Sequence, residues 1–259
     1  MEGEEPKIGL ALGAGALRGL CHLGLLQVFR EENIPVSFVA GTSIGAVMGA
    51  FFAAGKDLQL LIDVAKHLRL RHLVDPIIPR EGIIHGKKIT ELLHLFLQDI
   101  TFAELQIPLA VVATDLQCGT EVVLQKGSVV DAVRASISIP GIFTPVIKDG
   151  QILVDGCLVN RVPIDTVRKM GAEKVIAVSI LLPPLAQQLL KNVADIILQS
   201  FDVMQLQLTA CKTQRAEIVI EPNVAKFSPA RLDSVEECIQ EGAEAARRAL
   251  PQIRALLQT

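Results

Sequence analysis

The opening of the chain repeats one pattern twice: a short apolar run, a glycine-rich turn, and then a longer apolar segment with helical spacing. The runs at residues 8–12 and 37–40 predict buried strands, and the segments at 17–30 and 44–54 predict helices. This alternating order is typical of a parallel sheet whose faces are covered by helices. We therefore predict an α/β fold with a mainly parallel central sheet.

The remaining 200 or so residues continue the alternation and fit one domain over residues 1–259. Further strands are predicted at residues 109–114, 121–124, 151–154, 174–178 and 218–220. Further helices are predicted at residues 58–69, 89–97, 129–135, 185–211 and 235–257. The stretch 55–107 shows no clear strand and is predicted to be a helical insertion. For the long helix at 185–211, core packing is favoured over a substrate groove or a subunit contact in a homo-oligomer.

Composition excludes several classes of function. The formal net charge is -3, so there is no basic surface of the kind that nucleic acids require. The first five residues include three glutamates, unlike a secretory leader. The longest apolar run, 44–54, is about half of the roughly 20 residues of a spanning helix. We expect a soluble, cytoplasmic protein whose contact with membrane, if any, is peripheral. The five scattered cysteines favour neither a disulfide framework nor a zinc site.

A candidate nucleophile lies between the second strand and the second helix. Gly41-Thr42-Ser43-Ile44-Gly45 matches Gly-x-Ser-x-Gly, in which a sharp strand-to-helix turn exposes the serine hydroxyl. Gly41 and Gly45 let the turn pack closely, and the helix amino terminus favours negative charge nearby. The alternative is a structural serine cap on a tightly packed helix. We take Ser43 as the candidate nucleophile.

In an α/β-hydrolase the base is a histidine that follows the serine and the acid in the chain, and this sequence has no histidine in that place. The five histidines are His22, His67, His72, His85 and His94. Only His22, on the first helix, is a minor candidate. Otherwise a carboxylate must deprotonate the serine directly. Asp155 and Asp115 both end predicted strands and are equal candidates on spacing, whereas turn chemistry explains Asp149.

The first strand ends in Gly13-Ala14-Gly15-Ala16-Leu17-Arg18-Gly19. Arg18 stands where a dinucleotide fingerprint needs glycine, and the acidic residue expected after the second strand is missing. What is left is a loop of small residues with backbone N–H groups at a helix start. Amides of Gly15 and Ala16 could stabilise an oxyanion, and one such donor is typically worth about 3 kcal/mol of barrier. The alternative is a tight turn without chemistry.

Taken together, these motifs resemble the patatin-like phospholipase family, especially its compact bacterial members. The resemblance rests on the glycine-rich loop, the serine elbow and Asp155-Gly156, and it runs from Ile8 to about Val178. It also includes Arg18-Gly19-x-x-His22-x-Gly24 and the stretch Ala135-Ser136-Ile137-Ser138-Ile139-Pro140-Gly141-Ile142-Phe143. In the loop, Ala14 and Ala16 replace common glycines, and Cys157 follows Asp-Gly where a glycine or alanine is usual.

The resemblance implies a three-layer α/β/α fold and a Ser–Asp dyad, with the nucleophile at Ser43 and the catalytic aspartate at Asp155. It implies an oxyanion loop made of Gly13, Gly15, Ala16, Arg18 and Gly19, and no metal or cofactor. The implied activity is hydrolysis of fatty-acyl esters of phospholipids or lysophospholipids. Two alternatives stay open: an esterase or thioesterase for soluble acyl donors, and a non-catalytic regulatory protein on the same fold.

Overall fold

The computed structural model describes residues 6–76, 83–180 and 215–258, together with residues 193, 196, 197, 199, 200 and 203–205. The predicted helix at 185–211 therefore lies outside the described residues, apart from these short pieces. Within the described part, no helix is both long enough and apolar enough to span a bilayer.

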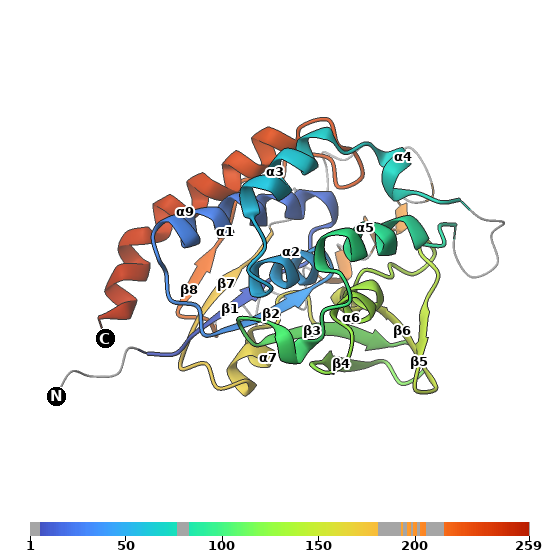
Figure 1. The fold of residues 1–259 in the computed structure, drawn as a ribbon, viewed down its shortest axis with the longest axis horizontal. Coiled ribbons are helices and arrows are strands. Elements are labelled where there is room, and N and C mark those ends of the chain that lie inside the picture. The colour runs from blue at the N-terminus through green and yellow to red at the C-terminus, as the bar shows by residue number, and fades with distance from the viewer. Residues whose placement is uncertain are drawn as a thin grey trace.

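A mixed eight-stranded sheet forms the centre of the molecule (Figure 1). Its path is β5-β6-β3-β2-β1-β7-β8, with β4 paired to β3 off this path. The pairings among β3, β2, β1, β7 and β8 are parallel, as predicted. Those of β4, β6 and β5 at the other end are antiparallel, so the sheet is mixed, with its parallel strands in the centre and at the β8 end. The strands are β1 (Ile8–Leu12), β2 (Phe38–Thr42), β3 (Leu109–Asp115), β4 (Thr120–Leu124), β5 (Val146–Lys148), β6 (Gln151–Asp155), β7 (Lys174–Val178) and β8 (Ile218–Ile220).

Helices cover both faces of this sheet, which gives three layers (Figure 1). The α-helices are α1 (Cys21–Glu31), α2 (Ile44–Ala53), α3 (Leu58–His67), α4 (Leu70–Leu73), α5 (Lys87–Leu97), α6 (Val129–Ser136), α7 (Ile164–Lys169) and α9 (Val235–Leu257). Short 3-10 helices are η1 (Ala16–Leu20), η2 (Phe102–Glu104) and η3 (Gly156–Leu158). The predicted first helix is thus divided into η1 and α1, while the sequence did not indicate α4, α7 or β5.

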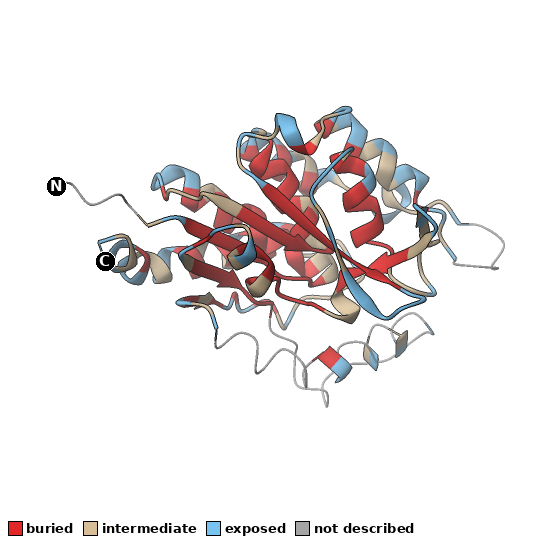
Figure 2. Cartoon of the chain, turned by 90° about the horizontal axis from the view of Figure 1, so that it is seen from below, coloured by how far each residue is buried: buried red, intermediate tan, exposed pale blue. Residues whose placement is uncertain are grey.

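The alternation of side chains along β1 explains why the helices on one face of the sheet form a thicker layer than the helix on the other. Ile8, Leu10 and Leu12 point into the main core with α1, α2, α3 and α9, whereas Ala11 faces α7. Because alternate residues of a strand point to opposite faces, large side chains fill the thick layer and small ones accept the close approach of α7. Figure 2 shows the central strands buried and the outward surfaces of the covering helices exposed.

The antiparallel end of the sheet is closed by the turn that the sequence indicated. Asp149 and Gly150 both have positive φ, of 50° and 77°, and they join β5 to β6. Two consecutive residues with positive φ form the tight hairpin turn in which Asp-Gly is common. The turn therefore accounts for Asp149, and β6 leads from it toward the centre of the sheet.

Candidate active site

The register of the sheet brings the ends of β2 and β6 together. Val111 and Val112 of β3 pair with β2 on one edge and with β4 on the other. Ala113 pairs with Asp155 of β6 and also with β4. Strands β2 and β6 must therefore share the edge opposite β4, where they meet end to end. Thr42 is the partner of Val112, so the next residue, Ser43, arrives beside Asp155.

At this meeting point Ser43 has an unusual backbone. Its φ of 55° and ψ of -126° lie outside the regions that L-residues favour, and such a conformation costs on the order of 1–3 kcal/mol. The flanking glycines are needed for close packing. A Cβ at Gly41 would meet the first turn of α2, and one at Gly45 would meet the end of β1. The predicted strand–serine–helix turn is therefore present, with Ser43 directly before α2.

Ser136 at the end of α6 holds this strained turn. Its hydroxyl accepts the Ser43 N–H at 2.8 Å and donates to the Val112 carbonyl at 2.6 Å. Ser136 is fully buried, so these bonds are shielded from competing water. In the sequence, Ser136 stands out only as part of the stretch 135–143 that resembles the family, and no role follows from that position. No local pattern links a residue at the end of α6 to the amide of residue 43.

The Ser43 hydroxyl donates to Asp155 Oδ2 at 2.6 Å. Ser43 is 5% exposed and Asp155 is fully buried. The other carboxylate oxygen, Oδ1, accepts the Cys157 N–H at 2.8 Å. Burial raises the pKa of Asp155 above its ordinary value, while the bonds from Ser43 and Cys157 partly oppose this rise. A higher pKa makes a carboxylate a stronger base, so the site can take a proton from Ser43.

The two other candidate bases have different partners. The Asp115 carboxylate accepts the amides of Gln117 and Cys118 and the side chain of Gln151, which place it in the β3–β4 turn. His22 is fully buried, and its Nε2 lies 2.9 Å from the Gly13 carbonyl oxygen. Burial lowers the pKa of His22 to about 4, so the ring is neutral at pH 7. Neither group bonds to Ser43, and His22 instead supports the glycine-rich loop.

The glycine-rich loop offers two backbone donors. The Gly13 and Ala14 amides donate to the carbonyls of Val178 and Arg161. Among the described residues, no acceptor pairs with the amides of Gly15 and Ala16. Ala16 has a φ of 49°, and it lines the same cavity as Ser43. These two amides are thus the ones available to a negatively charged oxygen.

The other loop residues have packing roles. The Gly13 amide is already bonded, so it is not available as an oxyanion donor. Arg18 is 3% exposed, and its Nε donates to the Phe227 carbonyl at 2.9 Å. A Cβ at Gly19 would meet the side chain of Ile44. Arg18 and Gly19 therefore contact the C-terminal part of the chain and the start of α2.

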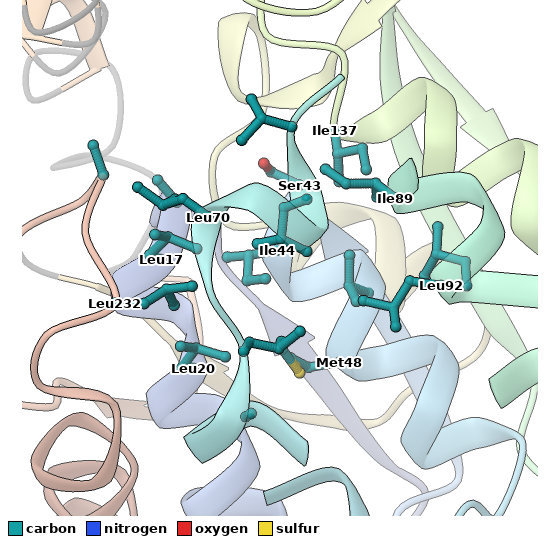
Figure 3. Close-up of a pocket in the computed structure, with 18 of the residues that line it drawn as sticks. Leu17, Leu20, Ser43, Ile44, Met48, Leu70, Ile89, Leu92, Ile137 and Leu232 are labelled. Carbon is teal, nitrogen blue, oxygen red and sulfur yellow. The ribbon is translucent and has the colours of Figure 1, made fainter. Parts of the chain in front are cut away.

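A cavity of about 380 Å³ opens over Ser43. Among the described residues, every lining side chain other than that of Ser43 is apolar. In Figure 3, Leu17, Leu20 and Leu232 form one wall, and Ile89, Leu92 and Met48 lie on the opposite side. We call Ser43, Asp155, Ser136 and the Gly15–Ala16 amides the floor of this cavity, and α3, α4 and α5 its roof. The roof comes from the predicted helical insertion.

Comparison with known proteins gives a family for this arrangement. A family model for patatin-like phospholipases matches residues 10–168, more than half of the chain. An uncharacterised NTE family protein of Mycobacterium bovis is 38% identical over 178 residues, which cover 68% of this chain and 49% of that protein. Neuropathy target esterase sws of Drosophila melanogaster is 32% identical over 181 residues, covering 67% of this chain and 13% of that protein. The chain spans about half the length of the mycobacterial relatives it matches.

A solved structure agrees with the fold. The crystal structure of VipD from Legionella pneumophila matches with a TM-score of 0.58 and 14% identity, covering 96% of this chain and 67% of that one. At this identity the likeness concerns the fold alone. It supports the three-layer arrangement of helices around a central sheet.

Proposed function

The chain belongs to the patatin-like phospholipase family, and on that premise we propose that it is a serine acyl hydrolase that cleaves fatty-acyl esters of phospholipids or lysophospholipids. The observation that carries the proposal is the Ser43–Asp155 hydrogen bond at the floor of an apolar cavity. A polar reacting pair beneath a wholly apolar chamber suits a substrate with a reactive ester and a long hydrocarbon chain. The volume of about 380 Å³ is at the lower end of the usual range of ligand pockets, roughly 300–1,000 Å³.

The proposed reaction has two steps. Asp155 takes the proton from Ser43 Oγ as that oxygen attacks the ester carbonyl carbon, and the Gly15 and Ala16 amides stabilise the resulting oxyanion. When the carbon–oxygen bond to the alcohol breaks, Asp155 returns its proton to the leaving oxygen. Water then gives a proton to Asp155 and attacks the acyl-enzyme, which releases the fatty acid and restores Ser43.

The apolar lining supports lipid over soluble acyl donors. Among the described residues, the cavity has no charged or amide side chain that would select a small polar acyl group. Burial of an acyl chain stabilises binding by about 0.8 kcal/mol per methylene. A long chain therefore binds far more tightly than a short one. Cytoplasmic location stays a prediction from the sequence.

Labelling with a fluorophosphonate tests the nucleophile, and product analysis tests the substrate. We expect wild type to be labelled at Ser43 and to release fatty acid from a mixed lipid extract. Ser43→Ala should lose both properties. Ser138→Ala, which removes another buried hydroxyl that does not bond to Ser43, is the matched control. Retained hydrolysis in a folded Ser43→Ala protein would refute the mechanism.

The same two measurements separate the alternatives. Absence of labelling in wild type would favour a non-catalytic protein. Release of acid from short soluble esters or thioesters, with no fatty acid from the lipid extract, would favour the soluble-donor alternative.

A further inference from the structure

The segment from Lys66 to Leu73 alternates basic and apolar side chains as it passes over the cavity. Leu68, Leu70 and Leu73 line the cavity, whereas Arg69 and Arg71 between them are exposed. Figure 3 shows Leu70 on the side of the cavity where Leu17 lies, across from Ile89 and Leu92. One short stretch of chain therefore presents leucines to the acyl pocket and guanidinium groups to solvent.

The start of α5 adds to this positive charge. Lys88 Nζ donates to the Arg71 carbonyl at 2.7 Å, so a lysine of α5 lies beside α4. The Asp75 carboxylate accepts the amides of Gly86 and Lys87, which ties the two segments together. We call Arg69, Arg71 and Lys88 the basic rim.

Three described carboxylates of α3, α5 and the α4–α5 connection have partners other than the basic rim. Asp75 is used by the amides of α5, and Asp63 accepts the side chain of Gln59 on its own helix. Glu91 lies near Lys87, at 3.8 Å. Within the part of the chain that the structure describes, no carboxylate forms an ion pair with Arg69, Arg71 or Lys88. The rim is thus a concentration of positive charge on a chain whose net charge is negative.

Apolar side chains are exposed at the same place. Leu70, which lines the cavity, is 43% exposed, and Ile83 is 41% exposed. The Ile83 amide donates to the carbonyl of Ile142, a residue of the cavity wall. The mouth of the cavity therefore combines exposed leucine and isoleucine with arginine and lysine that form no ion pair with a described carboxylate.

We propose that the basic rim, together with Leu70 and Ile83, docks the protein on the surface of an anionic lipid bilayer, so that the cavity opens toward the acyl chains. The positive charges match the negative headgroups, while the two apolar side chains enter the headgroup boundary. The proposal rests on the proposed function, because the cavity needs to face a bilayer only if its substrate is a lipid. A basic patch remote from the cavity would not have this implication.

Vesicle binding tests the proposal without requiring catalysis. The vesicles contain ether-linked phosphatidylcholine, alone or mixed with ether-linked phosphatidylglycerol, because ether lipids have no ester to cleave. We expect wild type to sediment with the mixed vesicles, and to do so less as salt rises. Arg69→Gln with Arg71→Gln should weaken this binding by about 30-fold, since each basic residue near an anionic surface contributes roughly a fivefold factor.

A matched control removes the same charge elsewhere. Lys126 lies at the β4–α6 connection and Lys148 in β5, and Figure 1 shows β4 and β5 at the bottom of the view and α4 at the top. Lys126→Gln with Lys148→Gln should bind mixed vesicles as wild type does. Both double variants should hydrolyse a short soluble ester at the wild-type rate, because neither pair contacts the floor.

Two results would overturn the docking surface: equal binding to neutral and mixed vesicles, or wild-type binding by the rim variant. In the second case, a changed size of the rim variant in solution would indicate a contact between copies of the chain. Charge-dependent binding without any ester hydrolysis would instead leave the docking surface standing and refute the proposed function.

Discussion

At the floor of the cavity, hydrogen bonds between buried polar groups fix the position of each atom, whereas the roof is held by apolar contacts between helices. Ser43 is held through its amide by Ser136 and through its hydroxyl by Asp155. Leu61, Leu93 and Leu97 of the roof helices pack against the main core. Hydrogen bonds are directional and short, while apolar contacts tolerate changes of shape if volume is kept. Activity should therefore be sensitive to the loss of single atoms in the floor, but in the roof only to changes in side-chain volume.

The largest effect should follow from Asp155→Asn at the floor. The amide keeps the shape of the carboxylate but cannot accept a proton from Ser43. We expect kcat for ester hydrolysis to fall by at least about 10⁴-fold, the range seen when a general base or its partner is removed. Steady-state kinetics on a short ester measures this, with circular dichroism as the control for folding. A loss of less than tenfold would mean that another group is the base.

Ser136→Ala should have the next largest effect. It leaves the Ser43 amide and the Val112 carbonyl without their buried partner, so the strained turn can relax. We expect steady-state kinetics to show kcat lower by about 100-fold with KM little changed, because small displacements of a nucleophile have effects of this size. The free energy of unfolding should fall by about 1–3 kcal/mol.

Ser138→Ala is the control for Ser136→Ala. The Ser138 hydroxyl is also buried, but it bonds to Arg134 rather than to Ser43. We expect it to lower stability to a similar extent while kcat per folded molecule stays near that of wild type. Equal losses of kcat in the two variants would show that Ser136 does not specifically position Ser43.

Ala65→Leu probes the roof, and its effect should be selective. Ala65 on α3 is buried and lines the cavity, so a larger side chain takes space from the acyl chain. We expect kcat/KM for long-chain esters to fall by about tenfold, with short-chain esters unaffected. Leu60→Ala changes an exposed position on the same helix and should alter neither. Equal losses for both chain lengths would show that the roof also positions the floor.

The smallest effect concerns the stability of Asp155→Asn. This variant should lose activity but gain stability. Burial raises the pKa of Asp155 in the folded protein, so the ionised carboxylate disfavours folding, and wild type loses stability as pH rises through that raised pKa. The asparagine of Asp155→Asn carries no charge at any of these pH values. We therefore expect this variant to have a higher Tm than wild type at pH 7. The difference should shrink below the ordinary pKa of aspartate, which differential scanning calorimetry at several pH values would reveal.

Local patterns in the sequence predicted much of the fold. The strand at residues 8–12 and the helix at 235–257 have the predicted bounds, because the first is a continuous apolar run that ends at glycines and the second has strong helical periodicity. Strand β5 and helix α7 were missed because their short segments mix polar and apolar residues, whereas the equally short β8 is an unbroken apolar run and was predicted. The antiparallel pairing of β6 with β3 joins residues about 40 positions apart in the chain, so no local pattern indicates it.

The site was predictable in its residue types more than in its geometry. Glycines around Ser43 identified the turn, but spacing alone could not separate Asp155 from Asp115. The role of Ser136 had no local signal, since its partner lies 93 residues away in the chain. Backbone donors such as those of Gly15 and Ala16 can be told from that of Gly13 only when the partner of each amide is known.

The end-to-end meeting of β2 and β6 on one edge of β3 makes this arrangement discrete rather than adjustable. A slip of β6 by one residue would move the carboxylate by about 3.4 Å and turn it to the opposite face of the sheet. No intermediate register exists in which the two side chains half meet. Single-residue insertions or deletions between Ile152 and Val154 should thus be far less tolerated over evolution than point substitutions there, although these residues never touch the acyl chain.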